Sequence, residues 1–190
     1  PLGNGRIGAM VYGDPVSEEY QLNEETVWSG SPYNNVNYNA KDALPEIRDL
    51  IFAGKNLEAQ QLAGKTIIST GSHGMAYQTV GSLHLDFKEI GAYEDYMREL
   101  DLENAVSKVS FVSDGVVYER ESFTSFTDQL LIIRMTASKK GRISFDASFS
   151  SPYPDAVRSV DNGCVLRLDG KGDDHETIEG KVKFTSLVKV

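Results

Sequence analysis

Adjacent carboxylates are the first residues of this sequence whose type could support chemistry. Two of these pairs are glutamates, Glu18-Glu19 and Glu24-Glu25. General acid–base catalysis by two carboxyl groups requires them to face each other across the reacting bond. Neighbouring residues on a strand point to opposite faces, so neither pair can converge in this way. We therefore predict no catalytic residue in this chain.

The residues that commonly bind metals are also scattered or isolated. Asp173 to Glu176 offer three carboxylates and an imidazole, but no second cluster accompanies them, and a solvated turn is the favoured interpretation. The histidines, His73, His84 and His175, show no metal-binding spacing. The single cysteine, Cys164, permits neither an internal disulfide nor a thiolate zinc site. We predict no metal and no cofactor.

Two other motifs fail the tests for their chemistry. Ser29 lies in Trp-Ser-Gly-Ser, which is not the Gly-x-Ser-x-Gly turn of a serine nucleophile. The segment Gly3-Asn4-Gly5 has the glycines of a phosphate-binding loop but lacks the Lys-Ser or Lys-Thr that should follow them. The glycines instead allow a turn from which we expect Asn4 and Arg6 to point outward.

Two polar groups near the start of the chain remain as candidates for a surface that contacts sugar or another domain. Members of the first are Asn4 and Arg6, and members of the second are Asn23, Glu24, Thr26, Trp28 and Tyr33. The alternative is ordinary turn chemistry with one core aromatic. For the first group both interpretations stay open. For Trp28 burial at a domain interface is favoured over direct stacking on a sugar, since its ring is large and amphipathic.

Composition bounds the class of protein. The chain has 190 residues, a net charge of −9 and 40% hydrophobic residues, typical of a globular protein with a sizeable core. The negative charge disfavours nucleic acid and anionic membranes as partners. No run of about 18 apolar residues predicts a membrane span. The chain starts at Pro1 without a methionine, has no signal peptide, and ends at Val190 inside an alternating pattern, so we expect a fragment of a larger protein.

Periodicity predicts the elements that position these residues. Helical spacing with cap residues indicates a two-helix insertion near residues 39–64, with Asn39 and Asn56 as caps and Gly54 and Gly64 as ends. From Val80 onward the period is two, as in half-buried strands. The Ser113-Asp114-Gly115 segment predicts a hairpin, and the apolar run from Gln129 to Met135 predicts a strand buried on both faces. These patterns predict an antiparallel β-sandwich forming one domain over residues 1–190.

Four phrases in order give the chain a resemblance to a known family. They are PLGNGRIGAMVYG, QLNEETVWSGSPY, the helical ALPEIRDLIFAGKNLEAQQLA and YQTVGSLHLDF, followed by residues 96–137. Together they resemble the N-terminal β-sandwich, of the super-sandwich type, of glycoside hydrolase family 95 α-L-fucosidases. The resemblance implies a parent that hydrolyses α-L-fucosides, typically Fuc-α1,2-Gal, with inversion; some members prefer α-L-galactosides. Its catalytic Glu and its Asp–Asn pair would lie in a separate (α/α)6 barrel, so none is carried over to this chain.

The resemblance therefore implies a non-catalytic domain, inactive alone, that packs against the barrel of its parent, which in turn acts on fucosylated oligosaccharides. The parent is expected to be secreted or periplasmic. The alternative hypothesis is a stand-alone carbohydrate-binding module. Such modules expose several aromatics on one face, whereas most aromatics here fall on patterns predicted to face the core, namely Phe111, Phe123, Phe126, Phe145 and Phe149.

Overall fold

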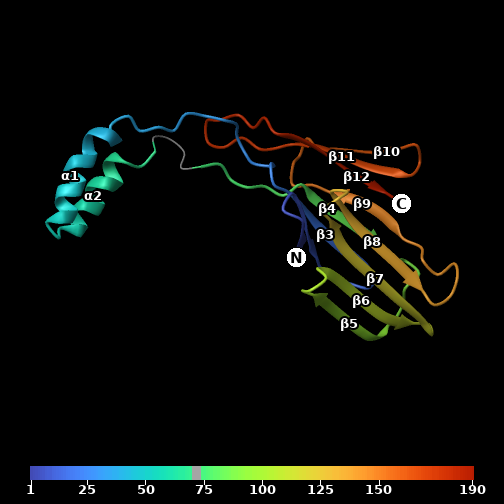
Figure 1. Ribbon diagram of the computed structural model, residues 1–190. Helices are drawn as coiled ribbons and strands as arrows, with labels where there is room; N and C mark the ends of the chain where they lie inside the picture. Colours follow the sequence, from blue (N-terminus) through green and yellow to red (C-terminus); the bar gives the residue numbers. More distant parts are fainter. Residues whose placement is uncertain (70–73) are drawn as a thin grey trace.

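Three antiparallel sheets and a pair of helices make up residues 1–69 and 74–190, the part of the chain that the computed structural model describes (Figure 1). The five-stranded sheet has the order β1-β2-β3-β4-β9, formed by Leu2–Gly3, Ile7–Val11, Ser17–Glu24, Gly81–Asp86 and Asp146–Ser150. The four-stranded sheet, β5-β6-β7-β8, is formed by Glu94–Asp101, Val106–Ser113, Val116–Ser125 and Leu130–Ala137. The three-stranded sheet has the order β10-β11-β12, formed by Val157–Asp161, Val165–Lys171 and Lys183–Lys189. The prediction of a mainly β, antiparallel sandwich is confirmed.

The core lies between the inner faces of the two larger sheets. Every second residue is buried along β6, and along β7 as far as Ser122, the pattern of strands with one face against a core. The five-stranded sheet contributes Val11, Tyr20, Leu83, Leu85 and Phe149, and the four-stranded sheet contributes Val109, Phe111, Val116 and Tyr118. The predicted hairpin joins β6 to β7, with Asp114 and Gly115 at φ 51° and 65°. Positive φ at both turn residues matches the right-handed twist of paired strands.

Two polar contacts cross the core and join the sheets. The Tyr20 hydroxyl lies 2.8 Å from the Ser122 hydroxyl, and both side chains are buried. Glu18 forms an ion pair with Arg120, and its carboxylate also accepts the amide of Gly13 at 2.7 Å. Glu18 faces inward while Glu19 faces outward, so the prediction that this pair points to opposite faces is confirmed.

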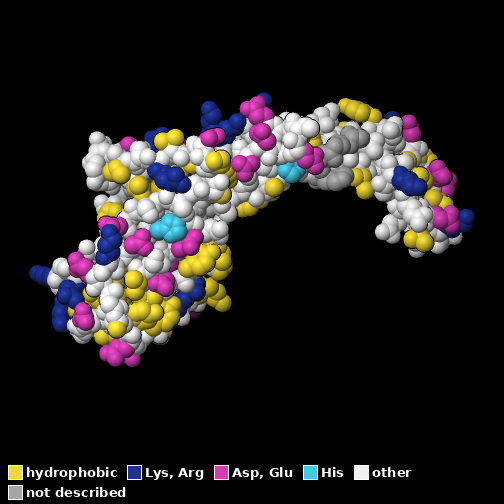
Figure 2. Space-filling model, turned by 180° about the vertical axis from the view of Figure 1, so that it is seen from behind, with side chains coloured by type: hydrophobic (Ala, Val, Ile, Leu, Met, Phe, Trp, Pro, Cys, Tyr) yellow, Lys and Arg dark blue, Asp and Glu magenta, His cyan; other side chains and the backbone are white. Residues whose placement is uncertain are grey.

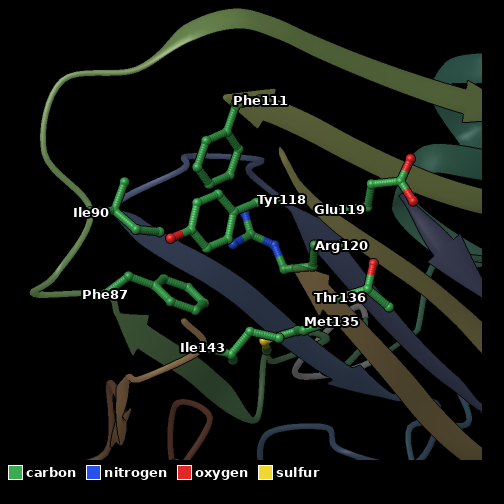
Figure 3. Close-up of a pocket in the computed structure, with 9 residues that line it drawn as sticks. All are labelled: Phe87, Ile90, Phe111, Tyr118, Glu119, Arg120, Met135, Thr136 and Ile143. Carbon is green, nitrogen blue, oxygen red and sulfur yellow. The ribbon is translucent and has the colours of Figure 1, made fainter. Parts of the chain in front are cut away.

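A small cavity borders the Arg120 side chain, where the guanidinium lies over the Phe87 ring (Figure 3). Its volume is about 20 Å³, room for one water molecule at most. Most of its walls are apolar, including Ile90, Met135 and Ile143. Such a space is too small for an organic ligand, so the cavity is part of the packing around a buried cation.

Two expectations about the core are wrong. The run from Gln129 to Met135 is not buried on both faces, because it belongs to β8, an edge strand that pairs with β7 and leaves Leu130 and Arg134 exposed. Phe126 is exposed in the turn after β7. Phe123 lies on the outer face of β7, since Arg120 and Ser122 fix the inner face one residue away. Arg120 and Ser122 are polar yet point inward, so apolar residues alone do not identify the face of β7 that meets the core.

The predicted two-helix insertion is present between β3 and β4. Helix α1 spans Ala40–Phe52 and α2 spans Asn56–Thr66. The helices pack against each other through residues such as Ile47 and Ala59, and they stand apart from the three sheets (Figures 1 and 2). Their ends differ in detail from the prediction. Asn39 occupies the N-cap of α1 without a side-chain hydrogen bond, Lys55 replaces Asn56 as the N-cap of α2, and α2 continues past Gly64.

Candidate functional site

The helical pair is carried on an arm, defined here as residues 29–76, which leaves and rejoins the sandwich at one place. Trp28 and Tyr77 form a β-bridge there, and the Ser29 amide donates to the Ala76 carbonyl at 2.9 Å. Further out, the Asn37 side chain donates to the Ile68 carbonyl at 3.0 Å. The two connecting segments of the arm are thus held together at both of these points. His73 lies outside the described residues.

The aromatic rings of Trp28 and Tyr77 mark the root of the arm. They meet edge to face, with centroids 5.1 Å apart. The indole nitrogen of Trp28 donates to the Glu25 carbonyl at 2.8 Å, and the Tyr77 hydroxyl donates to the Glu24 carbonyl at 3.2 Å. These contacts fix both rings, yet 43% of Trp28 and 47% of Tyr77 remain exposed. Rigid, half-exposed aromatics of this kind are typical anchors of protein interfaces.

A polar cluster adjoins the aromatic pair. The Arg6 guanidinium donates to one oxygen of Glu24 at 3.2 Å, and the amide of Thr26 donates to the other at 2.8 Å. Partial burial raises the pKa of Glu24, but hydrogen bonds from Thr26 and then from Arg6 outweigh it and hold the pKa below its ordinary value. Glu24 is therefore an ionised, fully engaged carboxylate, which suits positioning rather than proton transfer.

Asn4 does not share this surface. Its side chain is buried, its oxygen accepts the Ile7 amide at 2.9 Å, and its nitrogen donates to the Ser125 carbonyl at 2.7 Å. The expectation that Asn4 points outward is wrong, because the turn uses its amide group to connect β1 to the end of β7. Of the first candidate group, Arg6 alone is exposed.

The remaining candidates lie on either side of the root. Asn23 is half-buried on β3, opposite Gly8 of β2. Tyr33 is half-buried in the outgoing segment of the arm. Arg6, Glu24, Thr26 and Trp28 thus form one continuous surface through the contacts described above, with Tyr77 as a member that sequence analysis missed.

A loop from the three-stranded sheet completes the root. The Gly30 amide donates to the Asp173 carbonyl at 2.8 Å, and the Lys181 amide donates to the Gly30 carbonyl at 3.0 Å. The Gln78 side chain binds Asp173 twice, accepting from its amide at 3.0 Å and donating to its carboxylate at 2.8 Å. Sequence analysis interpreted Asp173 to Glu176 as a solvated turn. Asp173, Asp174 and Glu176 are indeed exposed, and the close approach to the root occurs at Gly172, where a Cβ would come within 2.9 Å of the Trp28 carbonyl.

The far end of the arm carries an apolar tip, defined as Ile51, Phe52 and Leu57. All three side chains are mostly solvent-exposed, and 85% of Phe52 is accessible. They flank the turn between α1 and α2, at the point farthest from the sheets (Figure 1). A cluster of apolar side chains at the end of a projecting element indicates a contact surface.

The root surface presents fixed aromatic rings beside a hydrogen-bonded carboxylate, an arrangement suited to binding. Among residues 1–69 and 74–190, no group of three His, Cys, Asp or Glu side chains is close enough to hold a metal ion. Within those same ranges, no helix has both the length and the apolar character that a membrane crossing requires.

Comparisons with known proteins identify relatives of this chain. Residues 1–190 match the family model described as glycosyl hydrolase family 65, N-terminal domain. The chain is 42% identical over 154 residues to alpha-L-fucosidase 2 of Arabidopsis thaliana, covering 80% of this chain and 18% of that protein. It is 32% identical over 164 residues to a probable alpha-fucosidase A of Aspergillus niger, covering 81% of this chain and 20% of that protein.

A probable alpha-fucosidase A of Aspergillus oryzae is 26% identical over 155 residues, covering 76% of this chain and 21% of that protein. The chain thus spans about a fifth of the length of the curated relatives that it matches. The expected kinship with the N-terminal part of α-L-fucosidases is confirmed. Since the family model covers its whole length, the chain belongs to the family of glycosyl hydrolase N-terminal domains.

Proposed function

We propose that this chain is the non-catalytic N-terminal domain of an α-L-fucosidase of the family 95 type, and that its arm contacts the catalytic part of the same parent. In this proposal residues 1–190 act as one domain, the catalytic part is an (α/α)6 barrel, and the substrates are fucosylated oligosaccharides. The observation that carries the proposal is the arm itself, whose helices stand away from the sandwich with an apolar tip and an aromatic root exposed.

The energetics of the arm support a covered state. Isolated helices shorter than about 12–15 residues are marginal in water, and most helical stability in proteins comes from tertiary packing. Helices α1 and α2 have 13 and 11 residues and bury few side chains beyond their mutual contact. A partner that covers the tip would supply the missing apolar burial. The curated relatives are about five times longer than the matched region, which leaves ample chain for such a partner.

The tip provides a direct test through a matched pair of phenylalanines. Phe52 lies at the tip and Phe126 in the turn after β7, with exposed fractions of 85% and 71%. In the isolated chain, Phe52→Ala and Phe126→Ala should each change the free energy of unfolding by less than about 0.5 kcal/mol. In the parent enzyme, Phe52→Ala should cost about 3 kcal/mol, as for a buried phenylalanine, while Phe126→Ala stays small. Equal effects of Phe52→Ala in both proteins would refute arm docking.

Trp28 tests the root in the same way. Its ring is half-exposed in this chain, so Trp28→Ala should cost the chain about 1 kcal/mol, the value of one aromatic contact. If the root is covered in the parent, the same change should cost about 3 kcal/mol there. Urea denaturation of both proteins gives the comparison. Equal losses would make Trp28 an ordinary residue of the sandwich surface.

Activity assays test the non-catalytic assignment. The isolated chain should not hydrolyse 2′-fucosyllactose, because in this proposal the two catalytic groups lie in the barrel and not in residues 1–190. Turnover that survives repurification of the chain would contradict the proposal. As the resemblance implies, we also propose a secreted or periplasmic location for the parent, which fractionation of the source cells can check.

A further inference from the structure

A second surface of the sandwich, which shares no residue with the arm, has the features of a ligand site. An open groove of about 470 Å³ lies between the turn that joins β2 to β3 and the segment that leads into β5. This volume falls in the range of small-molecule sites. Its lining combines three tyrosines with two carboxylates and a hydroxyl, namely Tyr12, Tyr93, Tyr96, Asp14, Glu19 and Ser17. We call it the tyrosine groove.

The three tyrosine rings are exposed and two of them are fixed. Tyr93 packs edge to face on the buried ring of Phe111, with centroids 5.9 Å apart, and lies 6.2 Å from the ring of Tyr96. The Tyr96 hydroxyl donates to the Gly13 carbonyl at 2.9 Å. Between 44% and 52% of Tyr12, Tyr93 and Tyr96 remains accessible. Rings that are held in place before binding lose little conformational entropy when a ligand stacks on them.

The carboxylates are anchored by one oxygen and free at the other. Asp14 accepts the amides of Val16 and Ser17 through Oδ1, each at 2.8 Å, and Glu19 accepts the Ser82 hydroxyl through Oε1 at 2.7 Å. Within the described residues, Asp14 Oδ2 and Glu19 Oε2 accept no hydrogen bond, and neither side chain has an ion-pair partner. The Tyr12 and Tyr93 hydroxyls likewise have no partner there. The tyrosine groove therefore presents oriented acceptors and donors beside flat apolar rings.

We propose that the tyrosine groove binds a neutral oligosaccharide. A pyranose has an apolar face of C–H groups that fits an exposed aromatic ring, and hydroxyls at its rim that donate to free carboxylate oxygens. An anionic ligand is disfavoured by Asp14, Glu19 and the net charge of −9. An apolar protein surface would leave both carboxylates buried without partners, which is costly. The proposal does not depend on arm docking, because the groove shares no residue with the arm.

The experiment is a titration of the 190-residue chain, followed by ¹⁵N–¹H correlation and saturation-transfer NMR. The neutral probes are 2′-fucosyllactose, lactose and cellotetraose, and the charged probes are 3′-sialyllactose and tetralysine. At least one neutral probe should bind with a dissociation constant of about 1 mM or better and shift the amides of residues 12–14, 16–19 and 93–96. Tyr12→Ala should weaken binding about fivefold, the value of one aromatic contact.

Tyr38→Ala is the matched control, since Tyr38 is an exposed tyrosine on the arm and this change should leave the affinity unaltered. The double variant Asp14→Asn with Glu19→Gln keeps acceptor oxygens and should retain part of the neutral binding. Three results would overturn the proposal. They are no saturable binding of any neutral probe, equal binding by Tyr12→Ala and the natural chain, and tighter binding of tetralysine that the double variant abolishes. The last result would identify a basic peptide as the occupant.

Discussion

Glu18 of β3 and Arg120 of β7 are paired inside the sandwich, where 0% and 5% of their side chains reach solvent. The pair is supported by the Gly13 amide, which donates to Glu18 at 2.7 Å, and by the Asp14 carbonyl, which accepts from Arg120 at 2.7 Å. One ion pair thus connects both sheets to the β2–β3 turn. Loss of either partner leaves a charge in the core without its counter-ion, which is more costly than loss of both.

Arg120→Met should therefore lower the free energy of unfolding by about 3–5 kcal/mol. The double variant Glu18→Leu with Arg120→Met should recover part of that loss, because no lone charge remains. The exposed pair of Arg134 and Glu121 provides the control, and Arg134→Met should cost less than about 1 kcal/mol. Urea denaturation measures all three variants. A double variant no more stable than Arg120→Met would show that the lone charge is not the source of the loss.

Tyr20 should make the sandwich sensitive to alkaline pH. Desolvation raises the pKa of Tyr20 to about 12 from 10.0, against the lowering effects of the Ser122 hydrogen bond and the Arg120 charge. A raised pKa in the folded state contributes stability that is complete below pH 10 and is lost as the pH rises towards 12. The loss should be on the order of 2 kcal/mol. Denaturation from neutral to alkaline pH measures it.

Tyr20→Phe is the corresponding control because phenylalanine does not titrate. At neutral pH the variant should be less stable by about 1 kcal/mol, since it loses the 2.8 Å contact with Ser122. Above pH 10 the difference between the variant and the natural chain should shrink. A constant difference across this range would mean that Tyr20 does not carry the alkaline loss.

Gly81 should not tolerate a side chain. Its φ is +135°, and a Cβ would lie 2.4 Å from the Ser150 carbonyl of β9. Because the Ser150 carbonyl belongs to the backbone of a strand paired with β4, it cannot move aside, and Gly81→Ala should cost about 2–4 kcal/mol. At Gly91 a Cβ would meet no atom within 4 Å, so Gly91→Ala should change stability by less than about 0.5 kcal/mol. Thermal or urea unfolding of the two variants compares them, and similar losses would contradict the clash.

The Gln78 side chain should hold the root of the arm closed. Gln78→Leu removes both of its hydrogen bonds to Asp173, so amide exchange at Gly30 and Lys181 should accelerate roughly tenfold. Hydrogen exchange followed by NMR resolves these amides. Asp155→Ala is the control, since Asp155 is exposed and lies in the C-terminal half of the chain, as Asp173 does. This change should leave the exchange rates of Gly30 and Lys181 unchanged. Unchanged rates in Gln78→Leu would show that the backbone contacts alone secure the root.

The strands of the sandwich could largely be predicted from sequence, and the inner face of β7 shows where this prediction fails. The Ser113-Asp114-Gly115 segment correctly indicated a hairpin, yet the inner residues of β7 include Arg120 and Ser122. A pattern of apolar residues alone cannot place a charged side chain in the core, because its partner Glu18 lies in a different sheet. Because Arg120 and Ser122 occupy the inner face of β7, Phe123 lies on the outer face, although sequence analysis assigned it to the core.

Sequence analysis located only part of the candidate site, because some of its residues come from distant segments of the chain. Trp28 and Glu24 stand out in the sequence because they are adjacent to a turn rich in glycine and serine. Tyr77 and Asp173, which complete the root, come from segments about 50 and 145 positions away, as their numbers show. No local pattern links them, since the pairing depends on how the sheets are stacked. The tyrosine groove was missed similarly, since Tyr12 follows β2 while Tyr93 and Tyr96 lie just before and within β5.

The bridge between Trp28 and Tyr77 closes the arm into a loop whose two ends meet on the sandwich. The entropy of closing a loop grows only slowly with its length, so the sheets tolerate insertions and deletions beyond this bridge. The arm can therefore lengthen, shorten or change its tip during evolution while the strand register stays the same. For protein engineering, the bridge is the natural splice point at which another helical hairpin can be grafted onto this sandwich.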